Sequence, residues 1–178
     1  MAQDNIIDWS ADTTLHWDDF EAEPHPGAYQ DAMATIRYGC TWNVESHDID
    51  DTLSFSIRNI RLNTVFVKNL SWARMNIVDE CLLVHMQGCF DLAEYIRADM
   101  EFMLTQKFEG KMYPVRGATP EEQKQNSMYD SRIVLGALQQ IHSTLDAKID
   151  EYQRDTRYGE DESSQATYNQ RFSSIKSV

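Results

Sequence analysis

The chain has 178 residues, of which 42% are hydrophobic and 25% charged, a composition typical of a folded globular protein and unlike that of a disordered chain. Its 29 acidic and 16 basic residues give a formal net charge of −13, which argues against nucleic-acid binding and against an anionic membrane surface, because both require clustered Lys and Arg. The chain has no apolar run of about 18 residues, so we expect no membrane-spanning helix.

The cysteines and the amino terminus bear on the compartment. Cys40, Cys81 and Cys89 are an odd number in a chain of this length, so they do not form a disulfide scaffold. The segment MAQDNIIDWSADTT has neither the basic nor the apolar region of a signal peptide. As the chain is written, we therefore predict a reducing, cytoplasmic location.

Residues 1–72 are expected to form mainly strands and loops. Leu15–Phe20, LHWDDF, has the pattern of a short strand running into a loop, and residues 34–45 alternate apolar and polar side chains with period two. The acidic stretch HDIDDT, residues 47–52, predicts a turn. The apolar positions change from odd to even parity near Arg58 and Asn59, which indicates a bulge or a turn there.

The second part of the chain has helical periodicity. We predict a motif helix over 74–108, with Asn76 as its cap and one apolar face that includes Cys81, His85, Cys89 and Met103. A second long helix is predicted over 119–158, where a Thr-Pro-Glu-Glu start is followed by an apolar stripe and by Gly159 as a stop. A short helix over 162–175 completes the chain.

Strands followed by long helices predict an α+β fold over residues 1–178 as a single domain, with a small antiparallel sheet packed on the long helices. The apolar stripe of the second helix lies within residues 134–152. It has two interpretations: a face buried in the core of one chain, or a seam through which a helical assembly protein dimerises.

The stretch HMQGCFD, residues 85–91, has the spacing of the zinc-protease motif HExxH with two positions changed. Met86 stands at the glutamate position and Cys89 at the second histidine position. Cys81, His85 and Cys89 share one helix face, but a rise of about 12 Å over eight residues lets only two neighbours ligate one metal. The simpler interpretation is a packed histidine between two small side chains.

Catalysis through this motif lacks its base. In HExxH the glutamate takes a proton from zinc-bound water, and the thioether of Met86 cannot accept one. The sequence also has no GxSxG, phosphate-binding loop or GxGxxG motif.

Five segments in order resemble the DUF922 family, predicted bacterial secreted zinc-dependent proteases with a zincin-like helix. They are Trp17-Asp18-Asp19-Phe20, the strand from Ala34 to Trp42, Ser71-Trp72, the segment LLVHMQGCFDL from Leu82 to Leu92, and YQRDTRYG from Tyr152 to Gly159 with Gln165 after it. The resemblance implies a zincin-like fold with His85 kept as a ligand. It also implies that Met86 replaces the base, Cys89 the second ligand, and Tyr158 a histidine that would be the third.

Framework positions of this resemblance survive, among them Gln87, Gly88 and Asp91, while the base and two ligands are lost. We therefore expect a catalytically inactive, metallopeptidase-like domain that binds a peptide or protein partner. Its candidate pocket comprises His85, Gln87, Cys89, Asp91 and Tyr158, with Tyr158 placed beside Cys89 and hydrogen-bonded to His85. The alternative is a metal-dependent hydrolase in which His85, Cys89 and Tyr158 bind zinc. Our first expectation is that the protein has no cofactor. The family is largely exported, in contrast to the location that the sequence itself predicts.

Overall fold

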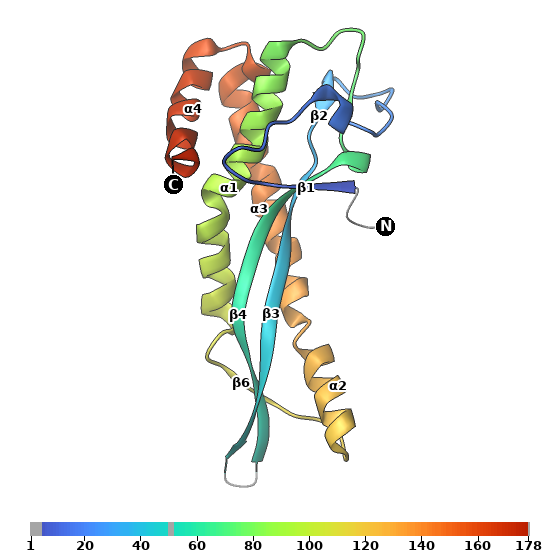
Figure 1. Cartoon of the computed structure of the whole chain (residues 1–178), viewed down its shortest axis with the longest axis vertical. Helices are drawn as coiled ribbons and strands as arrows, with labels where there is room; N and C mark the ends of the chain where they lie inside the picture. Colours follow the sequence, from blue (N-terminus) through green and yellow to red (C-terminus); the bar gives the residue numbers. More distant parts are fainter. Residues whose placement is uncertain (1–4, 50–51, 178) are drawn as a thin grey trace. The chain divides into compact units, whose positions relative to one another are not determined.

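The computed structural model describes residues 5–49 and 52–177 and has an α+β fold. Its central strand is β4 (Thr52–Val67), which lies beside the long strand β3 (Ile36–Ile49) (Figure 1). Two short strands also pair antiparallel with β4: β1 (Ile6–Asp8), through Ile6 and Val67, and β6 (Met112–Pro114), through Tyr113 and Phe55. The small antiparallel sheet predicted from the sequence is therefore present.

The residues form two compact units, each assembled from separate stretches of sequence. Unit 1 comprises Met1–Gly39, Asn63–Arg97 and Thr144–Val178, and unit 2 comprises Cys40–Leu62 and Ala98–Ser143. β3, β4 and the helices α1 (Glu80–Phe108) and α3 (Ile133–Thr156) each contribute to both. Neither unit is thus a contiguous segment of the chain.

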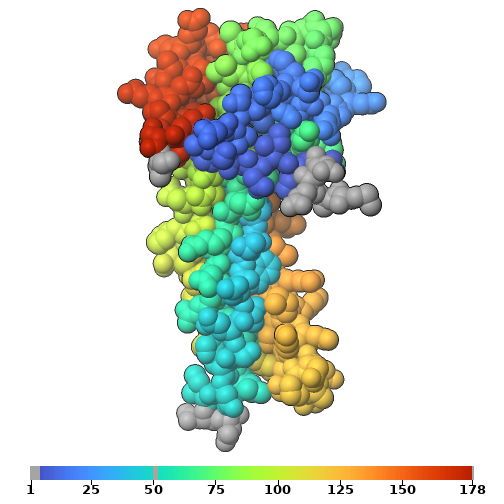
Figure 2. All heavy atoms as spheres, in the orientation of Figure 1, coloured from blue at the N-terminus to red at the C-terminus, as the bar shows by residue number. Residues whose placement is uncertain are grey.

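Unit 1 contains β1, a second sheet of β2 (Ala32–Met33) with β5 (Trp72–Ala73), and the carboxy-terminal helix α4 (Glu162–Lys176). Three aromatic rings pack in its core. The ring centroids of Phe20 and Phe66 are 5.1 Å apart, and those of Phe66 and Phe90 are 6.1 Å apart. Trp9 and Lys176 both bind Asp91, so the amino-terminal segment and α4 meet at α1. Figure 2 shows these two segments, blue and red, on one face of the unit.

Unit 2 contains β6, helix α2 (Pro120–Asp130) and the remaining parts of the long elements. Phe55 stacks on Tyr113 with ring centroids 5.2 Å apart. Two carboxylates, one on α1 and one directly after it, bind β4 between its β1- and β6-paired ends: Glu101 accepts from Leu62 N at 2.8 Å, and Glu109 from Ile60 N at 2.7 Å. These side chains take the place that a neighbouring strand would have.

Several strand predictions are confirmed and one is wrong. Alternation along β3 buries Ile36 and Tyr38, and Asn59, with φ of 52°, marks the predicted irregularity as a bulge inside the continuous β4. The expected strand at Leu15–Phe20 is instead the 3₁₀ helix η2 (Trp17–Asp19), because the Asp19 carboxylate accepts from His16 N and closes a tight turn. β3 extends to Ile49, and Asp50 and Asp51 of the predicted turn lie outside the described residues.

The predicted helix boundaries change at two places. α1 begins at Glu80 rather than in the region of residue 74, because Asp79 and not Asn76 caps it, accepting from Leu82 N at 2.9 Å. The predicted helix over 119–158 is two helices, α2 and α3, which are separated at Ser131 and Arg132. Ser131 is buried at this break, where its hydroxyl donates to Met128 O and accepts from Trp42 Nε1.

The apolar faces of the helices agree only in part with the expected pattern. On α1, Cys81 and Met103 are exposed, while Met86 and Phe90 are fully buried. On α3 the whole predicted stripe is buried within a single chain, as Val134, Leu138, Ile141, Leu145, Ile149 and Tyr152. That stripe is therefore a core face and is covered without a second copy. The short last helix is confirmed by α4.

Candidate functional site

His85 lies in the first half of α1, within unit 1, and its side chain is fully buried. The imidazole stacks on the ring of Tyr152, with centroids 4.7 Å apart and planes 10° from parallel. Its Nδ1 atom lies 3.2 Å from Thr156 Oγ1 and 3.3 Å from Gln165 Oε1. The ring is thus held by the end of α3 and by α4.

These contacts define the tautomer of His85. The Thr156 hydroxyl donates its hydrogen to Tyr152 O at 2.8 Å, so its oxygen can only accept from the imidazole. The Gln165 amide nitrogen donates to the Tyr152 hydroxyl, which leaves Oε1 as an acceptor facing His85. The network therefore assigns the hydrogen to Nδ1 and a lone pair to Nε2.

Nε2 of His85 is buried and has no hydrogen-bond partner among residues 5–49 and 52–177. Burial lowers the pKa of His85 to about 4, an effect that the hydrogen bond with Gln165 opposes. The imidazole is consequently neutral at physiological pH, with an unpaired acceptor in the interior of unit 1.

The two changed motif positions are both in the apolar interior. The Met86 side chain is fully buried, at the position where the resemblance implies a general base. Cys89 is also fully buried, and burial raises the pKa of its thiol to about 12, against a smaller lowering by a hydrogen bond with Gln153. The thiol is therefore protonated at neutral pH and is a poor metal ligand in this state.

Tyr158 lies beside His85, as expected, but in a different arrangement from the predicted hydrogen-bonded trio. Its ring meets the imidazole edge-on with centroids 6.0 Å apart, and 40% of the residue is exposed. The His85 Nδ1 atom is engaged by Thr156 and Gln165 rather than by Tyr158. The cluster buried around His85 thus contains Tyr152, Thr156 and Gln165 in place of Tyr158.

The backbone around Tyr158 is strained. Arg157 and Tyr158 have φ of 48° and 57°, in the left-handed region that L side chains rarely adopt. Gly159 follows at φ of 91°, and a Cβ atom there would lie 3.0 Å from the Cβ atom of His85. The glycine therefore permits both the turn and the close approach of the chain to α1.

Gln87 and Asp91 have structural roles and do not line a pocket with His85. The Gln87 side chain accepts from Leu15 N at 2.8 Å and donates to Asp91 at 3.0 Å. The Asp91 carboxylate also accepts from Trp9 Nε1 at 2.9 Å and pairs with Lys176. The predicted pocket of five side chains is thus corrected: Tyr158 lines an open pocket, His85, Cys89 and Asp91 are buried, and Gln87 is half-buried.

The sequence points to the hydrogen-bond and stacking partners of His85 only because they belong to the segments that resemble the family. Tyr152, Thr156 and Gln165 lie 67 to 80 positions beyond it, so no local spacing could associate them with it. The structure brings these residues and Gly159 together around one imidazole. The packing of Gly88 belongs to the same arrangement, because a Cβ atom there would overlap the Tyr152 hydroxyl.

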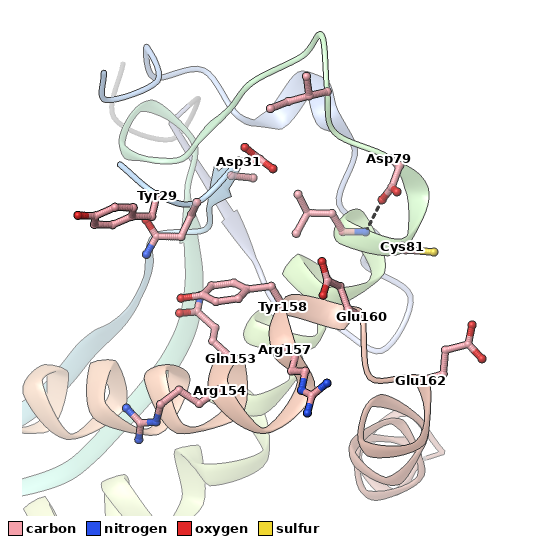
Figure 3. Close-up of a pocket in the computed structure, with 15 residues that line it drawn as sticks. Tyr29, Asp31, Asp79, Cys81, Gln153, Arg154, Arg157, Tyr158, Glu160 and Glu162 are labelled. Atoms are coloured by element: carbon pink, nitrogen blue, oxygen red, sulfur yellow. Dashed lines mark hydrogen bonds between the residues drawn. The ribbon is translucent and has the colours of Figure 1, made fainter. Parts of the chain in front are cut away.

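A pocket of about 800 Å³ adjoins this cluster within unit 1 (Figure 3). It is lined by residues 29–32 before and within β2, by residues before and at the start of α1, by Gln153 and Arg154 of α3, and by residues 157–160 and Glu162 after it. Figure 3 shows the ends of the Tyr158 and Gln153 side chains converging, while the guanidinium groups of Arg154 and Arg157 extend away from them. Tyr158 therefore lines the pocket and contacts His85 from outside the buried cluster.

One residue of β2, Ala32, lines this pocket. Arg74 N donates to Asp31 O at 2.8 Å, and Ala32 pairs with Ala73 in the next position of the antiparallel ladder. Positions in such a ladder alternate between hydrogen-bonded and non-hydrogen-bonded pairs, so the backbone N–H and C=O of Ala32 point away from β5. Ala32 itself is 1% exposed, so its backbone is covered in the unliganded protein.

The site does not fit a resident zinc ion of the kind that the family resemblance implies. Across the described parts of the chain, no three His, Cys, Asp or Glu side chains come together as a metal-binding group. The tautomer of His85 suits ligation by Nε2, since metal-bound histidines commonly donate their other ring N–H. The raised thiol pKa of Cys89 and the exposure of Tyr158 do not suit the remaining positions.

Comparisons with known proteins give no relative: no family model, curated protein or solved structure matches the chain. Within residues 5–49 and 52–177, no helix has the length and apolar character needed to cross a membrane.

Proposed function

We propose that the protein is a zincin-like, catalytically inactive relative of metallopeptidases that binds an extended peptide in the pocket beside Tyr158. The observation that carries the binding proposal is the pocket itself, bordered by the outward-facing backbone of Ala32 and by the strained segment at Tyr158. Strained backbone persists only where the surrounding structure holds it in place, and it is concentrated at functional sites.

The mode of binding proposed is strand addition. An extended peptide that pairs with β2 on the side opposite β5 would bind the N–H and C=O of the buried Ala32 once this edge opens, and its side chains would alternate between the pocket and solvent. The pocket volume of about 800 Å³ is within the usual range of ligand sites.

The loss of catalysis is supported by Met86. Its thioether is fully buried and cannot take the proton that a glutamate would take at this position. Two measurements test the proposed loss of catalysis. The triple variant Met86→Glu, Cys89→His and Tyr158→His restores the implied site and should bind zinc stoichiometrically by metal analysis. The purified wild type should not cleave casein. Casein cleavage by the purified wild type, abolished by His85→Ala, would contradict the proposed inactivity.

The binding proposal is tested with a library of extended hexapeptides titrated into ¹⁵N-labelled protein. We expect shifts at Ala32 and Tyr158, and we expect N-methylation of alternate peptide residues to abolish binding while methylation of the intervening residues leaves it unchanged. This alternation is the signature of strand pairing. Equal effects at all positions, or shifts confined to other surfaces, would overturn strand addition at β2.

A second candidate is the metal-dependent hydrolase with His85, Cys89 and Tyr158 as ligands. It is favoured by one observation, the unpaired lone pair of His85 Nε2 opposite a donating Nδ1. Metal analysis of the purified protein separates the two candidates, because stoichiometric zinc that is lost on Cys89→Ala would support the hydrolase and contradict the binding domain.

A further inference from the structure

The unpaired nitrogen of His85 calls for a physical explanation. A buried acceptor without a partner costs about 1–3 kcal/mol, and native proteins contain few such atoms. Here the Nδ1 side of the ring is fully engaged by Thr156 and Gln165, and Tyr152 covers one face. The Nε2 atom alone lacks a partner within the described residues.

Tyr158 contacts this imidazole and also lines the open pocket. Its ring contacts His85 edge-on, yet the residue is 40% exposed and lines the pocket. Tyr158 and Arg157 are both left-handed, a conformation that costs non-glycine residues about 1–3 kcal/mol each. Tyr158 is thus partly in solvent and belongs to a strained turn, which lowers the cost of moving it away from His85.

We propose that Tyr158 is a movable cover over His85, and that Nε2 of His85 accepts a hydrogen bond from a protonated amine of the bound peptide once the ring moves aside. This inference rests on the proposed peptide-binding function and identifies the group recognised. A lone pair selects a donor and rejects a carboxylate. Four carboxylates line the pocket against two guanidinium groups, and this acidic excess favours a cation over an anion. The carboxylates are those of Asp31, Asp79, Glu160 and Glu162, and the guanidinium groups are those of Arg154 and Arg157.

The cover is tested without any ligand, by the reaction of diethyl pyrocarbonate with unprotonated imidazole nitrogen. Mass spectrometry should find His85 protected in the wild type relative to the exposed His25, and modified about tenfold faster in Tyr158→Asn, because the covering ring is gone. Asparagine is chosen because it tolerates the left-handed backbone. Tyr158→Phe, which keeps the ring, should remain protected.

Tyr29→Ala is the matched control, because Tyr29 lines the same pocket and is fully exposed. Its His85 should stay protected. Rapid modification of His85 in the wild type, or equal rates in Tyr158→Asn and Tyr29→Ala, would overturn the cover.

The recognised group is tested with peptide pairs from the same library, one with a free amino group and one acetylated. The amine should bind about tenfold more tightly, and this preference should disappear in His85→Phe, which retains a planar ring. Binding without any preference for the amine would refute this inference and leave the peptide-binding function intact. Binding of neither peptide would refute the proposed function itself.

Discussion

His85 has a chemical environment that ties its protonation to folding. Its pKa is about 4 in the folded protein and 6.5 in an unfolded chain, so between these values the unfolded chain binds the additional proton. The contribution of the neutral His85 to the free energy of unfolding is therefore fully present above about pH 6.5, and it is lost progressively as the pH falls towards 4. From about pH 7.5 to about pH 5, we expect a loss on the order of 2 kcal/mol from this one group.

Urea unfolding of the wild type and of His85→Gln at the two pH values measures this loss, since contributions from carboxylates cancel in the difference. His25→Gln, at an exposed histidine, is the control and should keep the wild-type profile. An identical pH dependence in His85→Gln and the wild type would contradict the assignment of a neutral, buried imidazole.

Two glycines in helices provide a matched pair of alanine substitutions. Gly88→Ala places a Cβ atom 2.9 Å from Tyr152 Cζ and in overlap with its hydroxyl, so Tyr152 must leave its stacked position on His85. We expect a loss of about 1–3 kcal/mol in the free energy of unfolding, the usual cost of overpacking. Chemical denaturation followed by circular dichroism is the measurement.

The control is Gly136→Ala on α3, where an added Cβ atom meets no heavy atom within 4 Å. Alanine has the higher helix propensity, so this variant should gain up to about 1 kcal/mol. If Gly88→Ala is as stable as Gly136→Ala, the packing of Tyr152 against α1 is looser than the structure indicates.

For single residues, the sequence identifies His85, Met86 and Cys89 as the candidate site but does not predict which side chains surround them. Helical spacing alone associates His85 with Cys81 and Cys89, yet Cys81 is exposed and the ring partners come from α3 and α4. Periodicity reports which face of one helix is apolar, whereas the contacts of a buried polar group depend on tertiary packing across distant segments.

Among the elements, β4 has an edge that α1 covers with side chains. Glu101 accepts from Leu62 N at 2.8 Å and pairs with Arg61 at 3.0 Å. Glu101→Ala should cost about 1–2 kcal/mol, because a partly buried backbone N–H loses its acceptor. Glu101→Gln keeps an acceptor oxygen and should cost less, and Asp99→Ala on the exposed part of the same helix should be nearly neutral.

Hydrogen exchange at Leu62 tests the same contact locally. The amide should exchange faster in Glu101→Ala than in Asp99→Ala, with the amide of Phe55 unaffected because it belongs to the strand region paired with β6. Unchanged exchange at Leu62 in Glu101→Ala would show that another group protects this edge.

The break between α2 and α3 shows where reading elements from sequence fails. The capping segment at Thr119 and the apolar stripe after Val134 are both strong signals, and both are confirmed by the structure. Ser131 and Arg132 between them are compatible with a continuous helix. The break accompanies a long-range hydrogen bond, from Trp42 Nε1 to Ser131 Oγ at 2.8 Å, which no local propensity encodes.

For the whole molecule, composition and the order of periodicities predict the α+β class, because they depend on sums over long segments. The division into two compact units is not predictable in this way. β3, β4, α1 and α3 have no change in composition at the positions where they pass from one unit to the other, and each remains continuous there.

The net charge of −13 leads to a prediction for the whole molecule. Excess like charge destabilises a compact state through repulsion, while the exposed ion pairs that oppose it contribute little each. Screening by sodium chloride up to about 0.3 M at neutral pH should therefore raise the urea midpoint, with a gain in the free energy of unfolding on the order of 1 kcal/mol.

Near pH 4.6, the isoelectric point, this gain should vanish or reverse, because attractive ion pairs are then the main interactions that salt screens. Potassium chloride should act equally, since the effect is one of ionic strength, and a midpoint that falls with either salt at neutral pH would show that ion pairs outweigh the repulsion.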